Sequence, residues 1–159
     1  VPVENTLGKP GQGARIMLQA LNNGRLSIAA MGLGIAQGAF EQALSYSKTR
    51  KQFGQTIFRN QAIAFRLGEL AMKIEHARLF LYQACRMKDE GKNFIRESAM
   101  TKLYTSELAK EVADFAIQVH GGIGLLKGHP VERFYRDQRI LQIGEGTSEI
   151  QKLIISRML

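Results

Sequence analysis

The most regular hydrophobic pattern lies in the middle of the chain, where apolar residues alternate steps of four and three. The positions are Ile63, Leu67, Leu70, Ile74, Ala77, Leu81 and Ala84. This spacing places the side chains on one face of an α-helix and is typical of helices that pack at a shallow angle in a bundle. The polar segment 89–93 ends the pattern. The sequence therefore predicts a long helix with one buried face.

Two further patterns predict a long helix on each side of it. In the segment 14–46, Ile28, Met31, Ile35 and Ala39 recur at helical spacing before a polar, basic break at 48–52. The third pattern consists of Ala99, Leu103, Ser106, Ala109, Val112, Ala116 and Val119. Two glycines, at positions 121 and 122, follow it and are typical of helix ends, because glycine readily adopts left-handed backbone.

The C-terminal part predicts two shorter helices separated by a break. Pro130 favours a helix start, since its missing N–H would be unpaired there anyway. Gly144-Glu145-Gly146 interrupts the chain, and Ser148 with Gln151 has the spacing of a capping box that opens a last helix running to Met158.

The N-terminal segment differs from the rest. Residues 1–13 carry prolines and glycines, which favour an extended lead-in over a helix. No alternating strand pattern of useful length follows residue 13, and 159 residues with 45% apolar content suit one domain. The predicted fold class is all-α: an up-and-down four-helix bundle with a short extended N-terminal lead-in segment.

Charge narrows the classes of ligand. The net charge of +8 is compatible with nucleic acid, an anionic surface or a phosphate-rich small ligand. Lys and Arg are spread among acidic residues, without a run of five like charges and without interleaved stacking aromatics. We therefore expect no nucleic-acid partner. No unbroken apolar stretch approaches membrane-spanning length, so we also expect no membrane span.

Cysteine and histidine usage gives no indication of a metal site. Cys85 is the only cysteine, which excludes an internal disulfide. His76, His120 and His129 are scattered, without cysteine or acidic neighbours at ligand spacing. We expect no metal.

Several residues are candidates for chemistry, each with a structural alternative. Glu145, between two glycines, could approach a ligand and act as a general base if apolar neighbours shield it from water, although an exposed loop glutamate is commoner. The glycines of 121–124 could expose backbone amides to a phosphate or merely end a helix. Arg25 and Arg50 could clamp a phosphate or simply lie on the surface. Close helix contact explains Gly32, Gly34 and Gly38 better than a dinucleotide motif does, because no strand precedes them.

Four strings in order then resemble the C-terminal third of the acyl-CoA dehydrogenase family. They are Arg50-Lys51-Gln52-Phe53-Gly54, Gln118-Val119-His120-Gly121-Gly122-Ile123-Gly124, Pro130-Val131-Glu132-Arg133-Phe134-Tyr135-Arg136-Asp137 and Ile143-Gly144-Glu145-Gly146-Thr147-Ser148-Glu149-Ile150-Gln151. The resemblance implies that residues 1–13 end a preceding β-domain and its linker, and that residues 14–159 form the C-terminal helical bundle domain.

The same resemblance implies FAD as cofactor and a homotetramer built as a dimer of dimers. Arg50, Phe53 and Gln61 would contact the FAD of a neighbouring subunit. The run Gln118, Val119, His120, Gly121 and Gly122 would do so through main-chain amides. Thr147, Ser148 and Glu149 would hold the subunit's own flavin at a helix start, where the helix dipole favours negative charge.

For catalysis, the resemblance implies that Glu145 removes the α-proton of an acyl-CoA while the β-hydrogen leaves as hydride to the flavin. Its backbone N–H would polarise the thioester carbonyl. Asn22, Arg25 and Gly146 would bind the acyl-CoA. The electron acceptor would be an electron-transfer flavoprotein, the location would be the bacterial cytoplasm or the mitochondrial matrix, and the isolated domain would be inactive.

Three departures from the family pattern bear on the substrate. Asn22 replaces a frequent aspartate, and Leu125 and Gly144 replace frequent aromatics, which would reshape the acyl pocket. Some family members carry the base at the position of Gly24, where glycine cannot serve, so the resemblance favours Glu145 and the short- and medium-chain arrangement. The competing hypotheses are an acyl-CoA oxidase that reduces oxygen and a noncatalytic helical oligomerisation module.

Overall fold

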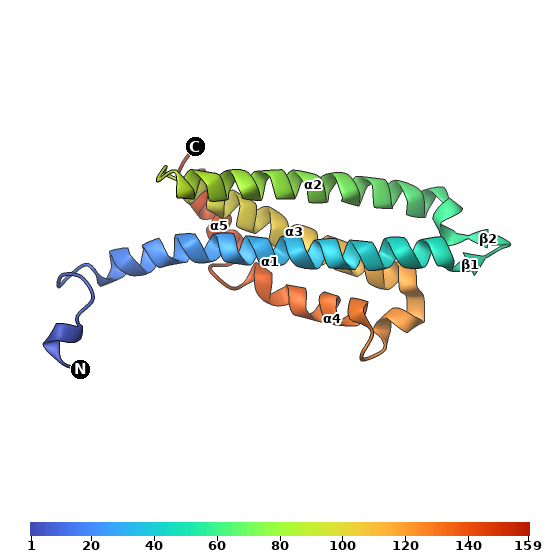
Figure 1. Ribbon diagram of the computed structural model, residues 1–159, viewed down its shortest axis with the longest axis horizontal. Helices are drawn as coiled ribbons and strands as arrows, with labels where there is room; N and C mark the ends of the chain where they lie inside the picture. Colours follow the sequence, from blue (N-terminus) through green and yellow to red (C-terminus); the bar gives the residue numbers. More distant parts are fainter.

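Three long helices of alternating direction form most of the molecule (Figure 1): α1 (Gly13–Thr49), α2 (Gln61–Asp89) and α3 (Ile95–His120). The computed structural model describes residues 1–159. A fourth, antiparallel layer is divided between α4 (Pro130–Asp137), the 3-10 turn η4 (Gln138–Gln142) and α5 (Ser148–Ser156). The up-and-down helical bundle predicted from the sequence is confirmed, with its last helix in pieces.

The α2 seam is buried as predicted. Six of its positions are 3% exposed or less: Leu67, Leu70, Ile74, Ala77, Leu81 and Ala84. Ile63, near the start of the helix, is partly buried and packs against the same core. The seam therefore faces α1 and α3 along almost its full length.

The predicted pattern on α1 is only partly confirmed. Ala39 is 0% exposed, Ile28 and Ile35 are partly buried, and Met31 is 53% exposed. Ala29, Leu33 and Ala36, which the pattern did not include, are also buried against the core. Alanine suits this interface because it lets two helix backbones approach closely.

Glycine makes this approach closer still. A β-carbon added to Gly32 would lie 3.0 Å from the carbonyl carbon of Thr105 on α3, and one added to Gly38 would lie 2.9 Å from the ring of Phe134 on α4. Packing therefore explains these two glycines. Gly34 has no atom within 4 Å of such a carbon, so close contact does not account for it.

A small hairpin that the sequence did not predict connects α1 to α2. Strands β1 (Lys51–Gln52) and β2 (Gln55–Thr56) pair antiparallel, and the 3-10 turn η2 (Ile57–Arg59) follows. Phe53 and Gly54, between the strands, have φ of 53° and 78°, as a two-residue type I′ turn requires. Strands of two residues are too short to produce an alternating pattern.

The first residues also depart from the prediction. The lead-in contains a 3-10 turn, η1 (Val3–Asn5), rather than a wholly extended segment. Residues 1–11 are exposed, and the first turns of α1 extend beyond the bundle (Figure 1). No helix is both long and apolar enough to cross a membrane.

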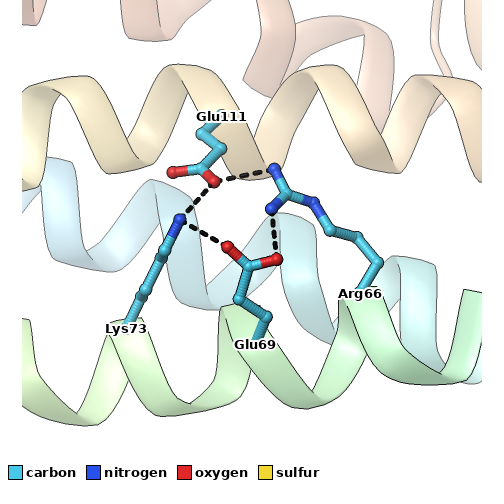
Figure 2. Close-up of polar contacts among 4 residues, drawn as sticks. All are labelled: Arg66, Glu69, Lys73 and Glu111. Carbon is cyan, nitrogen blue, oxygen red and sulfur yellow. Dashed lines mark hydrogen bonds and ion pairs between the residues drawn. The ribbon is translucent and has the colours of Figure 1, made fainter.

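Figure 2 shows a network of charges that ties α2 to α3 at the surface. Arg66 and Lys73 of α2 both bind Oε1 of Glu111 on α3 at 2.7 Å. Glu69 lies between them and binds Arg66 at 2.6 Å and Lys73 at 2.8 Å. Charges of opposite sign thus face each other across the two helices beside the buried seam.

Candidate functional site

The Glu145 carboxylate lies against the backbone of α1 at Gly24. A β-carbon built on Gly24 would lie 2.5 Å from Oε2 and 3.0 Å from Oε1 of Glu145. No real β-carbon tolerates such contacts, so the absence of a side chain at position 24 makes room for the acid. Glu145 comes from the loop between η4 and α5 and is only partly buried.

Glu145 holds a backbone conformation that side chains rarely adopt. Its φ is 56°, and that of the next residue, Gly146, is 94°. Left-handed backbone at a residue other than glycine, asparagine or aspartate costs on the order of 1–3 kcal/mol and persists only where the surroundings fix it.

Two buried side chains fix this turn. Nε2 of Gln151, on α5, donates to the carbonyls of Glu145 at 3.1 Å and Gly146 at 2.9 Å. Nζ of Lys102, on α3, donates to the same Gly146 carbonyl at 2.7 Å. Both side chains are 0% exposed.

Neither residue was among the sites predicted from the sequence. The sequence does contain a signal for Lys102. It lies three residues after Ala99 and four before Ser106, so a lysine falls on the predicted buried face. Gln151 was assigned to a capping box with Ser148. The structure corrects this: Thr147 is the N-cap and accepts a hydrogen bond from the Ile150 N–H at 3.4 Å, while Gln151 faces inward.

Positive charge is concentrated near the acid. Arg25 is 5% exposed, donates to Oδ1 of Asn22 and leaves its Nε without a partner. Burial lowers the pKa of Arg25, and the negative charge of Glu145 partly opposes that shift. Burial likewise lowers the pKa of Lys102, opposed first by Glu107. The predicted substrate residues Arg25 and Gly146 therefore lie beside Glu145, and Asn22 contacts Arg25.

The start of α5 forms the next part of the site. The Ser148 hydroxyl donates to Oε1 of Glu107 at 2.7 Å, and the Gln142 amide donates to Oε2 at 2.7 Å. Hydrogen bonds from its own N–H and from the Thr147 hydroxyl lower the pKa of Glu149. A polar cavity of about 240 Å³ opens here and is lined by Glu107, Arg139, Gln142, Ile143, Thr147, Ser148, Glu149 and Lys152.

The remaining predicted cofactor residues lie at the opposite end of the bundle. Arg50, Phe53 and Gln61 are exposed around the hairpin. At a rise of ~1.5 Å per residue, Arg50 lies about 40 Å along α1 from Gly24. The two groups of residues are therefore too far apart to surround the same small group.

The run 118–122 lies at the same end of the bundle as Arg50, Phe53 and Gln61. His120 is 6% exposed, stacks on Tyr46 of α1 with ring centroids 4.3 Å apart and binds the Ala116 carbonyl at 2.7 Å. Val119, within α3, is also buried, so neither side chain presents an exposed group to a ligand. Gly121 has φ of 63°, and its N–H already caps α3. Gly122 is exposed, with nothing within 4 Å of an added β-carbon.

Comparison with known proteins identifies the family. Residues 11–159 match the family model described as acyl-CoA dehydrogenase, C-terminal domain. Over its full 159 residues the chain is 48% identical to a probable acyl-CoA dehydrogenase of Bacillus subtilis, and it covers 42% of that relative. A mitochondrial short-chain specific acyl-CoA dehydrogenase of Mus musculus is 46% identical over 156 residues, or 98% of this chain and 38% of the relative.

Another relative belongs to a complex with an electron-transfer flavoprotein. The caffeyl-CoA reductase-Etf complex subunit CarC of Acetobacterium woodii is 45% identical over 159 residues, or 100% of this chain and 42% of the relative. The chain thus spans about two fifths of the length of the relatives that it matches.

Solved structures give the same fold. Butyryl-CoA dehydrogenase from Megasphaera elsdenii superimposes with a TM-score of 0.97 at 42% identity, over 99% of this chain and 41% of that one. A structure of PigA with FAD and proline has a TM-score of 0.95 at 31% identity, over 99% of this chain and 41% of that one. The chain belongs to the acyl-CoA dehydrogenase family and corresponds to the C-terminal domain of its members.

Proposed function

We propose that the longer protein containing this chain is an FAD-dependent acyl-CoA dehydrogenase that converts an acyl-CoA to a trans-2-enoyl-CoA, with Glu145 as the base. The observation that carries the proposal is the placement of the Glu145 carboxylate. It is held in a strained turn against the bare backbone of Gly24, beside the buried cation of Arg25.

The residues present suit the removal of a proton next to a thioester carbonyl. Glu145 takes the α-proton on a carboxylate oxygen, and its backbone N–H donates to the carbonyl oxygen, where negative charge develops. Arg25 favours the same charge through its buried guanidinium. Asn22 and Gly146 line the approach of the CoA ester, where Asn22 already accepts a hydrogen bond from Arg25.

The start of α5 suits the flavin. The N–H groups of the first turn of a helix have no partners within that helix, and the helix dipole there favours negative charge. Thr147, Ser148 and Glu149 provide that turn, and Arg139 and Lys152 line the adjoining polar cavity. Bound FAD supplies the acceptor for the β-hydride.

The two groups of predicted cofactor residues lie far apart in one chain, which supports an FAD site formed between two subunits. Arg50, Phe53, Gln61 and the run 118–122 cannot reach a flavin held at the α5 start of the same chain. They would instead contact the flavin of a second subunit in the proposed homotetramer.

An exposed apolar stripe on α2 is consistent with that assembly. Phe65, Met72 and Leu79 recur every seven residues and are 69%, 53% and 66% exposed. They face away from the buried seam of the helix. Apolar residues at this spacing are typical of a helix that packs against another subunit.

The electron acceptor proposed for the parent protein is an electron-transfer flavoprotein, supported by the relative that belongs to an Etf complex. Short acyl-CoAs are the first substrates to test, because the mouse and Megasphaera relatives are named for short chains. Bacterial cytoplasm or mitochondrial matrix is the proposed location.

Anaerobic addition of acyl-CoAs of several lengths to the full-length holoenzyme tests the reaction. The proposal predicts loss of the oxidised flavin absorbance and formation of the enoyl-CoA. Retained absorbance with every acyl-CoA would contradict it. In air, rapid peroxide formation without an electron-transfer flavoprotein would instead favour an acyl-CoA oxidase.

A further inference from the structure

Lys102 is a fully buried lysine without an acidic partner. Its side chain is 0% exposed, and none of the ion pairs of the structure includes it. Its one hydrogen bond, of 2.7 Å, runs from Nζ to the Gly146 carbonyl. The carboxylates that act on its charge, Glu107 first, lie beyond ion-pair distance. Burying an ammonium group without a direct ion pair is unfavourable, and an apolar side chain would fill the same space without that cost. Packing alone therefore does not account for a lysine here.

Gln151 converges on the same carbonyl from a different helix. Its amide reaches the Gly146 carbonyl at 2.9 Å and the Glu145 carbonyl at 3.1 Å, and its side chain is 0% exposed. α3 and α5 thus each contribute one buried donor to the same turn. Three hydrogen bonds fix the planes of the two peptide groups that follow Glu145.

Those two peptide planes determine where the acid points. Fixing the carbonyls of Glu145 and Gly146 fixes the backbone torsions between them, including the left-handed φ of 94° at Gly146. Together with the φ of 56° at Glu145 itself, this turn brings the carboxylate to the open backbone of Gly24. Without the donors, the turn could relax toward the conformations that a glutamate prefers.

We propose that Lys102 and Gln151 are positioning residues that hold the Glu145–Gly146 turn and thereby aim the Glu145 carboxylate at the α-proton of the substrate. The inference rests on the proposed role of Glu145 as base. Neither residue touches the reacting atoms, and both act through the Gly146 carbonyl.

The rate at which the α-proton exchanges with solvent measures proton removal by Glu145 without hydride transfer to the flavin. The probe is 3,3-dimethylbutanoyl-CoA, whose β-carbon bears no hydrogen and so cannot supply a hydride. In D₂O the Glu145 carboxylate takes an α-proton. The C–H electron pair forms the carbon–carbon double bond of the enolate, and the π pair of the thioester carbonyl moves to its oxygen. After the acid exchanges its proton with solvent, a deuteron returns to the α-carbon. Mass spectrometry of the recovered thioester gives the rate.

The experiment uses the full-length holoenzyme with Lys102→Met and, separately, Gln151→Met. Each substitution removes a donor and retains an unbranched side chain of similar length. We expect exchange to slow by about tenfold to a hundredfold, as for a catalytic group displaced by ~1 Å. FAD content by absorbance and the probe's Kd by calorimetry should stay within about twofold of wild type. Lys110→Met, at an exposed position of α3, is the matched control and should leave all three unchanged.

The outcomes separate this inference from the proposed function. Exchange that persists in Glu145→Gln would contradict the role of Glu145 itself. Exchange that is lost in Glu145→Gln but stays within twofold of wild type in both methionine variants overturns only the positioning role. If one methionine variant does not assemble, the other decides. Loss of FAD or of probe affinity in both variants would assign the two residues a purely structural role and also overturn the inference.

Discussion

Gly24 and Glu145 occupy complementary space: a β-carbon on Gly24 would lie 2.5 Å from Oε2 of Glu145, in the volume that the carboxylate fills. The pairing links a glycine in the middle of a helix to an acid in a loop more than a hundred residues later. Glycine within a helix costs about 1 kcal/mol relative to alanine, and at position 24 the space that it leaves is occupied by the Glu145 carboxylate.

Gly24→Ala should therefore displace the carboxylate. We expect flavin reduction by acyl-CoA to slow by about tenfold or more, because a catalytic group moved by ~1 Å loses most of its advantage. Thermal stability should rise or stay the same, since alanine favours the helix. Gly34→Ala is the matched control on α1, because nothing lies within 4 Å of its added β-carbon. Equal rates in both variants would refute the steric relationship.

The same relationship predicts that the base can be moved. The test combines Gly24→Glu with Glu145→Gly. The new glutamate side chain begins on α1 at the place that the Glu145 carboxylate reaches in the wild type. We expect the double variant to reduce its flavin faster than Glu145→Gly alone by at least about tenfold, a partial recovery of the roughly 10²–10⁴-fold that a general base contributes. Stopped-flow absorbance measures both rates. No gain in the double variant would mean that the two positions do not serve the same α-proton.

The buried seam of α2 gives a prediction for stability. Leu70→Ala or Ile74→Ala should each lower the free energy of unfolding by about 2–5 kcal/mol, because both side chains are fully enclosed and would leave a cavity. Urea denaturation provides the measurement. Glu75→Ala, on the exposed side of the same helix, should cost less than about 1 kcal/mol. A small loss at both seam positions would refute the helix register.

The network in Figure 2 predicts a specific dependence on pH. Hydrogen bonds from Lys73 first and Arg66 second lower the pKa of Glu69 from 4.5 to about 2. A lowered pKa in the folded state means that the stabilisation is complete above pH 4.5 and is lost as the pH falls toward 2. The Tm difference between wild type and Glu69→Gln should follow this course and shrink at high salt, because Glu69 is partly exposed. A Tm difference that does not change between pH 6 and pH 3 would contradict it.

Regular packing was readable from the sequence. The α2 seam is apolar at every buried position, and four of the six are Leu or Ile, so hydrophobicity and burial coincide. On α1 they coincide only in part, because Ala29, Gly32 and Ala36 lie on the inner face close to α3 and Met31 lies outside. A pattern weighted by side-chain size therefore misses the buried positions that small residues occupy.

The candidate site was only partly readable. The break at Gly144-Glu145-Gly146 marked Glu145, and the resemblance gave it a role. The contact with Gly24 and the donors Lys102 and Gln151 come from three different helices. Such contacts depend on how helices are placed in space, and no local pattern records that placement. Lys102 on a buried face was the one available signal.

Flavin reduction in Glu145→Gln tests the central claim most directly. Full-length wild type and Glu145→Gln, each with bound FAD, would be mixed anaerobically with short acyl-CoAs while the flavin absorbance is followed. The side chains have nearly the same shape, so the change removes the base while preserving the packing against Gly24. We predict loss of absorbance in wild type and a rate at least about 100-fold lower in the variant, the lower bound for a general base. Equal bleaching in both proteins would show that another group removes the proton.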